Sequence, residues 1–246
     1  MLHEAKYSCH VNMQGAHGFS DYFRIQGDRS MNIQAMIADL SSGMLSSLQI
    51  FCLTLLFSLP LGLIVAFGRM SKNVVLRTIM KVYISIMRGT PLMLQLMVVY
   101  FGPYYIFGIR ISNNYRFYAV IIGFVLNYSA YFAEIYRGGI ESMARGQYEA
   151  AQLLGYTKLQ TFFKIILPQV VKRILPSITN EIITLVKDTS LAFAIGYSEM
   201  FTTAKAWASK ETNMIPYVGA AVFYYVFNLV VAVAMERIEK RLNYYE

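Results

Sequence analysis

The sequence predicts an all-α, polytopic membrane protein that crosses the bilayer with five helices. Of its 246 residues, 56% are hydrophobic and only 15% are charged, whereas a soluble domain usually carries about a quarter charged residues. The apolar residues form long stretches without charge, as expected of a chain whose solvent is lipid. Lys and Arg lie mainly between those stretches, so membrane topology explains the net charge of +8, and no nucleic-acid partner is expected.

The first thirty residues differ in composition from the rest of the chain. Residues 1–30 are polar and contain all three histidines, which are spaced seven residues apart. The segment has no apolar run and so does not have the pattern of a signal peptide. We expect a disordered tail at 1–30, no metal site, and a transmembrane domain over 31–246. The two cysteines show no spacing pattern, so neither a disulfide framework nor a metal centre is predicted.

Four uncharged stretches are long enough to cross the hydrocarbon layer at 1.5 Å per residue. They contain 29, 21, 17 and 24 residues and lie between charged residues that bound them on both sides. The shortest becomes a crossing when its flanking residues are included. The predicted spans are about 43–68, 90–109, 116–137 and 212–236.

A fifth span is predicted over 174–200 from the distribution of charge. This segment is apolar overall but contains Glu181, Lys187 and Asp188. Basic residues gather at 69–88, at 137–173 and at 237–241, and the positive-inside rule places all three groups in the cytoplasm. The second and third groups share one side only if the chain crosses twice between them. We therefore expect five spans, with the N-terminus outside and the C-terminus inside.

The cytoplasmic loop over 138–172 is helical by its pattern. A short helix is expected at 147–154, where Gly155 ends it with a left-handed cap. Ala150 and Ala151 keep one face of this helix flat, as required for docking into a groove of a partner. Glu149 is expected at the beginning of the docking turn, where a carboxylate favours a helix N-terminus. A helix lying on the inner leaflet would show similar features, so the residues alone leave both readings open.

The spacing of this loop resembles the EAA loop of importer permeases in the ABC transporter superfamily. The matching positions are Glu149, Ala150, Ala151, Gly155, Ile165, Leu167 and Pro168. Three further segments resemble the polar amino-acid permeases of that superfamily, which take up histidine, glutamine or arginine: RGTPL at 88–92 with Gln95, AYFAEIYRGGI at 130–140, and KDTSL at 187–191. The resemblance covers about 33–242. It implies a type I ABC importer permease-like fold whose loop helix is the coupling helix.

The resemblance also implies partners. The chain contains no G-x-x-x-x-G-K-[ST] phosphate loop, so ATP and Mg²⁺ are expected on a separate ABC ATPase subunit, and this chain is not expected to be an enzyme. Five helices are few for a closed path, which implies a second permease subunit, either another copy or a sister chain. An extracytoplasmic amino-acid-binding protein would deliver the cargo at the bacterial inner membrane.

Two polar stripes on consecutive spans predict a substrate path, because polar residues inside a membrane are costly and usually functional. Asn127, Tyr131 and Glu134 share one helix face. The second stripe consists of Ser177, Asn180, Glu181, Thr184 and Asp188. Structural roles are the alternatives: Glu134 could form an ion pair with the nearby Arg137, Asp188 could brace neighbouring helices, and Tyr131 could simply pack.

Two other functions are compatible with a membrane protein of this kind. An ATP-independent secondary carrier or channel is the first, but such carriers usually show internal repeats and more spans, and no repeat is visible. A membrane-embedded enzyme would need a compact catalytic set, and every histidine lies in the tail. The sequence does not indicate which amino acid is carried.

Overall fold

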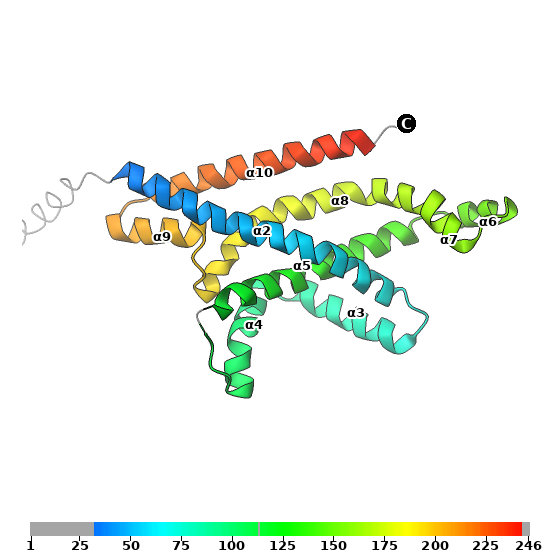
Figure 1. The fold of residues 1–246 in the computed structure, drawn as a ribbon, viewed down its shortest axis with the longest axis horizontal. Helices are drawn as coiled ribbons and strands as arrows, with labels where there is room; N and C mark the ends of the chain where they lie inside the picture. The colour runs from blue at the N-terminus through cyan, green and yellow to red at the C-terminus, as the bar shows by residue number, and fades with distance from the viewer. Residues whose placement is uncertain (1–31, 113, 243–246) are drawn as a thin grey trace, which may run out of the picture.

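The computed structural model describes residues 32–112 and 114–242, and these residues form helices joined by short connections (Figure 1). The tail predicted at 1–30 lies outside the described residues. Four long helices run along the longest axis of the molecule: α2 (Ile33–Arg69), α5 (Tyr115–Glu141), α8 (Leu167–Asp188) and α10 (Ile215–Leu242). One end of the molecule carries α6 (Arg145–Leu153) and α7 (Lys158–Gln160), and the opposite end carries α9 (Met200–Glu211).

Two shorter helices form a bent pair in the middle of the molecule. They are α3 (Val74–Gly89) and α4 (Leu92–Phe107), and their axes differ in direction by 111°. In Figure 1, α4 runs across the direction of the long helices. Two segments continue α8 at its ends, the π-helical η1 (Thr161–Ile166) before it and the 3-10 helix η2 (Thr189–Ile195) after it.

The described residues contain three helices that are long and apolar enough to cross a membrane, α2, α5 and α10. The number is four if α3 and α4 together make one broken span. An all-helical, polytopic architecture is therefore confirmed. The charged residues of α8 keep it outside this group, so the predicted count of five spans stays a prediction.

Two predicted boundaries differ from the structure. The first span, predicted at 43–68, lies within a helix of 37 residues that begins ten residues earlier, where Asn32 caps it by accepting a bond from the Ala35 amide at 3.0 Å. The basic segment 69–88, which separates the first two predicted spans, contains all of α3 except Gly89. The span predicted at 174–200 is α-helical only to Asp188, because the chain tightens into η2 and then turns at Gly196, whose φ is +69°.

The core is built where α5 packs between α2 and α8. Phe124, Tyr128 and Phe132 on α5 are buried, together with Ile50 of α2 and Leu185 of α8. The two backbones of α2 and α5 come close at Gly62, where an added Cβ would lie 2.9 Å from the Cβ of Phe132. Close approach of this kind is what small residues allow between membrane helices. It holds α5, which carries the first polar stripe, in a defined position.

The end that carries α9 is joined by hydrogen bonds to both α2 and α10. The indole N–H of Trp207 on α9 donates to Asp39 of α2 at 2.9 Å. The fully buried Glu199 caps α9 by accepting from the amides of Phe201 and Thr202, and the hydroxyl of Tyr224 on α10 donates to it at 3.1 Å. A buried carboxylate is tolerated here because several donors satisfy it.

Candidate functional site

A cavity of about 390 Å³ lies where the beginning of α4 meets α5 and α8. Its lining includes five of the six residues that the polar stripes predicted for a path: Asn127, Tyr131, Glu181, Thr184 and Asp188. The remaining lining residues are Thr90, Pro91, Leu92, Tyr128 and Leu191. Two stripes that are about fifty residues apart in sequence therefore face one hollow.

The α8 side of the cavity carries both of its carboxylates. Glu181, Thr184 and Asp188 are spaced three and four residues apart and so share one face of α8. Asp188 accepts a hydrogen bond from the hydroxyl of Tyr128 on α5, at 2.8 Å between Tyr128 Oη and Asp188 Oδ2. Because Tyr128 is only 2% exposed, it fixes one carboxylate oxygen and leaves the rest of the group to the cavity.

Lys187 points away from the cavity that its neighbour Asp188 lines. It lines a different hollow of about 420 Å³ together with Tyr217 and Tyr224 of α10. Adjacent helical residues point about 100° apart, so these two charges face different hollows. Lys187 is thus not a residue of the cavity between α5 and α8.

Glu134, the sixth predicted path residue, is held in an ion-pair network. The single N–H of Arg137 Nε is shared between the two carboxylate oxygens, at 3.1 and 3.2 Å, and Nη2 donates to the carboxylate at 2.6 Å. Arg137 Nη1 also pairs with Glu141 Oε2 at 2.5 Å, and Arg88 Nη1 lies 4.0 Å from Glu134 Oε2. The structure therefore shows the Arg137 pair that was the alternative to a path role. Glu134 does not line the cavity, and its contact with substrate stays a prediction.

Asn127 touches the cavity, but its amide group is engaged elsewhere. The side chain is 4% exposed, and its Nδ2 donates to the Met87 carbonyl at 3.1 Å and to Gln95 Oε1 at 2.9 Å. These partners belong to the bend between α3 and α4. The polar stripe included Asn127, which lines the cavity, but did not reveal its partner Gln95. The sequence did offer one signal for Gln95: it is a polar amide within an apolar span, five residues after Thr90.

The loop helix α6 ends as the sequence predicted. Gly155 has a φ of +79°, in the left-handed region. The amide of Tyr156 donates to the Ala151 carbonyl and the amide of Gly155 to the Gln152 carbonyl, both at 3.0 Å. This pair of bonds is the Schellman motif, which satisfies carbonyls at a helix end. The predicted cap at Gly155 is confirmed.

Two expectations for α6 are wrong. The helix begins at Arg145, two residues earlier than predicted, so Glu149 lies in its second turn and gains little from the positive N-terminus. Ala151 is 2% exposed, because α6 folds back on η1 and successive helical residues point about 100° apart. Only Ala150 of the two alanines is exposed, and it lies near Leu153 and Leu154, which are 90% and 75% exposed.

The remaining loop residues join α6 to α8. Ile165 and Leu167 are partly buried, and Pro168 is exposed at the second position of α8. Between them, Ile166 is buried with Met143, Val170 and Ile174. Ile165 packs against this cluster, and Leu167 and Pro168 begin α8, so none of the three shares the exposed face of α6.

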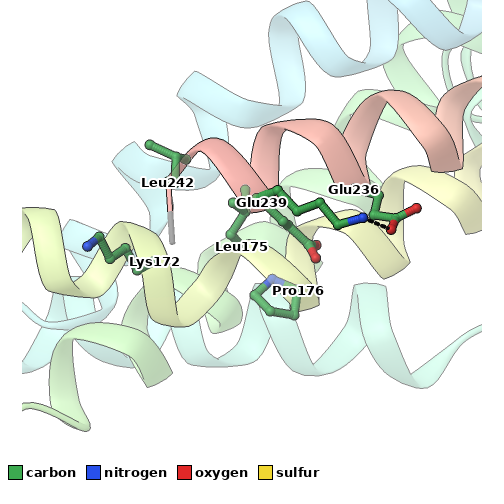
Figure 2. A pocket seen from close by; sticks show the side chains of 7 residues that line it. Lys172, Leu175, Pro176, Glu236, Glu239 and Leu242 are labelled. Carbon is green, nitrogen blue, oxygen red and sulfur yellow. Dashed lines mark ion pairs between the residues drawn. The ribbon is translucent and has the colours of Figure 1, made fainter. Parts of the chain in front are cut away.

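A separate hollow of about 360 Å³ lies between the first half of α8 and the last turns of α10 (Figure 2). Its charged residues bind partners in this chain. Lys240 pairs with Glu236 at 2.6 Å, and Glu239 accepts a bond from the Thr179 hydroxyl at 2.6 Å. None of the predicted path residues lines it. The bond between Thr179 and Glu239 attaches α10 to α8, whereas the Lys240 pair lies within α10, and we assign both a structural role.

Comparison with known families identifies the chain. The profile of the family described as "Binding-protein-dependent transport system inner membrane component" matches residues 58–244, which is more than half of the chain. The chain belongs to this family. The permease is therefore a multi-pass protein of the inner membrane and works as the membrane component of an ABC importer, in which a separate subunit binds ATP. This confirms the predicted family and excludes the secondary carrier and the enzyme.

Individual relatives agree with the family assignment. The permease is 36% identical over 208 residues to the L-cystine transport system permease protein TcyB of Bacillus subtilis, covering 84% of this chain and 87% of the relative. It is 40% identical over 186 residues to the "Probable amino-acid ABC transporter permease protein YckA" of the same organism, covering 75% and 80%. A solved amino acid ABC transporter with histidines has 29% identity and a TM-score of 0.76, covering 94% of this chain and 99% of that one.

Proposed function

We propose that the permease translocates a polar amino acid through the cavity between α4, α5 and α8. The observation that carries this proposal is the convergence of five polar path residues on one hollow of about 390 Å³, a size within the range of roughly 300–1,000 Å³ typical of small-molecule sites. The transport of L-cystine by a relative's system and the histidines in the solved transporter support an amino acid as cargo.

The chemistry of the lining suits a molecule with an ammonium group. Asp188 and Glu181 present carboxylates on the same face of α8, and hydrogen bonds between charged groups are the strongest available to them. The hydroxyls of Tyr131 and Thr184 add neutral partners around them. The α-ammonium of the amino acid would bind at the carboxylates, and Tyr128 would keep Asp188 oriented toward it.

The proposed topology has five crossings, with the N-terminus outside and the C-terminus inside. The crossings are α2, the bent pair α3 and α4, α5, α8 and α10. The last turn of α2, the first turns of α8 and the last turn of α10 lie toward the end of the molecule that carries α6 (Figure 1). Basic residues are found at each of these positions, and the positive-inside rule assigns that end to the cytoplasm.

The proposed partners follow from this topology. The exposed face of α6, with Ala150, Leu153 and Leu154, would dock in a cleft of the ABC ATPase subunit as the coupling helix. A second permease subunit, identical or sister, would complete the path across the membrane. An extracytoplasmic amino-acid-binding protein would deliver cargo at the end that carries α9.

Direct binding tests the cavity. The permease is purified with its ATPase subunit, and binding of labelled histidine, glutamine and arginine is measured without the binding protein. Asp188→Asn removes the charge that faces the ammonium, so the dissociation constant of the tightest ligand should rise at least roughly tenfold, since hydrogen bonds to charged groups contribute about 1.5–3 kcal/mol. Glu236→Gln, an exposed carboxylate on α10, is the matched control. Unchanged binding in Asp188→Asn, or an equal loss in the control, would refute the assignment.

A further inference from the structure

The bend between α3 and α4 leaves backbone carbonyl groups at the end of α3 that need hydrogen-bond donors. A helix that ends inside a bilayer leaves carbonyl groups without partners in its last turn, and lipid offers none. The end of α3 lies next to the buried α5 residue Asn127 and contributes Thr90 and Pro91, which follow it, to the wall of the cavity. The position of these wall residues therefore depends on how the end of α3 is held.

Gln95 on α4 reaches back across the bend and supplies the missing donors. Its Nε2 lies 2.9 Å from the Met87 carbonyl, 3.1 Å from the Thr90 carbonyl and 2.8 Å from the Thr90 hydroxyl. The Thr90 hydroxyl in turn donates to the Ile86 carbonyl at 2.8 Å. The two N–H groups of one amide are thus shared among three acceptors at the end of α3 and tie α4 to it.

Asn127 completes the arrangement from α5. Its Nδ2 donates to Gln95 Oε1 at 2.9 Å and to the Met87 carbonyl at 3.1 Å. The two amides are consistent with each other, because Gln95 accepts with its oxygen and donates with its nitrogen. At Gly89 itself an added Cβ would meet nothing within 4 Å, whereas Leu92 and Leu96 of α4 pack in the buried cluster of α5. The hydrogen bonds of the two amides add a polar attachment of the bend to α5.

We infer that Gln95, acting through Asn127, is a positioning residue that sets the wall of the substrate cavity at Thr90 and Pro91. Gln95 itself does not line the cavity, so its effect on cargo is indirect. The inference rests on the proposed function, because it takes the cavity as the binding site. It assigns Asn127 a second role beside any contact with cargo.

The first measurement compares single substitutions. In the purified complex of permease and ATPase, Gln95→Leu should raise the dissociation constant of the labelled amino acid by roughly five- to tenfold, because the carbonyls lose their donors and the wall shifts. Recovery of the ATPase subunit should stay at the wild-type level. The matched control is Gln49→Leu on an exposed position of α2, far along the chain from the bend, and its binding should be unchanged.

An exchange of the two amides tests whether they act as a pair. The double variant Gln95→Asn with Asn127→Gln keeps the combined length of the two side chains, so the amides can still meet. Its dissociation constant should return toward the wild-type value, whereas each single substitution should weaken binding. A double variant that binds as poorly as the singles, or that fails to assemble with the ATPase, overturns the inference.

The same experiment distinguishes this inference from the proposed function. If Asp188→Asn weakens binding but Gln95→Leu does not, the cavity stands and the role of Gln95 is refuted. If neither variant alters binding, the cavity itself is refuted, and the inference fails with it.

Discussion

The cap of α6 offers the most direct test of coupling to the ATPase. Gly155 has a φ of +79°, and an added Cβ at this position would meet nothing within 4 Å. In Gly155→Ala the only penalty is therefore the backbone strain of an L-residue in the left-handed region, about 1–2 kcal/mol. We expect the strain to distort the end of the helix where Leu153 and Leu154 are exposed.

The control comes from the same helix. Gly146 lies inside α6, and a Cβ there would also meet nothing within 4 Å. Gly146→Ala therefore adds the same methyl group without strain, and alanine is favoured over glycine inside a helix by about 0.5–1 kcal/mol. The two variants have the same chemistry and equal space, and they should act in opposite directions on the helix.

Titration of the purified ATPase onto the reconstituted permease measures the effect. A strain of about 1–2 kcal/mol weakens binding by roughly 5- to 30-fold. The Gly155→Ala permease should therefore retain less of the ATPase subunit and show less substrate-stimulated ATP hydrolysis. Permease levels in the membrane should be normal. Wild-type retention of ATPase in Gly155→Ala would refute the role of α6 as coupling helix. An equal loss in Gly146→Ala would show that added volume, and not the left-handed backbone, matters.

Two further predictions concern topology and packing. A cysteine at Tyr156 should react with an impermeant label only from the cytoplasmic side and one at Ser112 only from outside, and the reverse pattern would end the proposed orientation. Gly62→Ala should lower the thermal midpoint of the purified complex, because its Cβ would lie 2.9 Å from the Cβ of Phe132 and crowding costs about 1–3 kcal/mol. Gly138→Ala, which has open space, should not, and equal midpoints would contradict the close packing of α2 and α5.

Much of the candidate site could be predicted because it depends on helical periodicity. Residues three and four apart share a helix face whatever the helix packs against. Glu181, Thr184 and Asp188 were therefore grouped before any neighbour was known, and the structure places all three on one cavity. Gly155 was predictable for a similar reason, since a left-handed cap depends on the local backbone and on the missing Cβ.

The bend between α3 and α4 could not be predicted from helical periodicity. Uncharged length predicts how much chain can cross a bilayer, but it does not show where a crossing is broken, because the broken ends are satisfied by residues from elsewhere. Here the donors come from Gln95 and Asn127, which lie 32 residues apart in sequence. The sequence shows both amides, but it does not predict the hydrogen bond between them.

The sequence by itself determined the membrane class, the family and the faces of the polar stripes, because composition, motif spacing and helical period are local properties. The tertiary structure alone decided that Ala151 faces inward, since α6 folds back on η1, and that Glu134 is held by Arg137. It also decided which stripe residues share a cavity. These outcomes depend on contacts between distant segments, and the free energy of such contacts is defined only once the helices have packed.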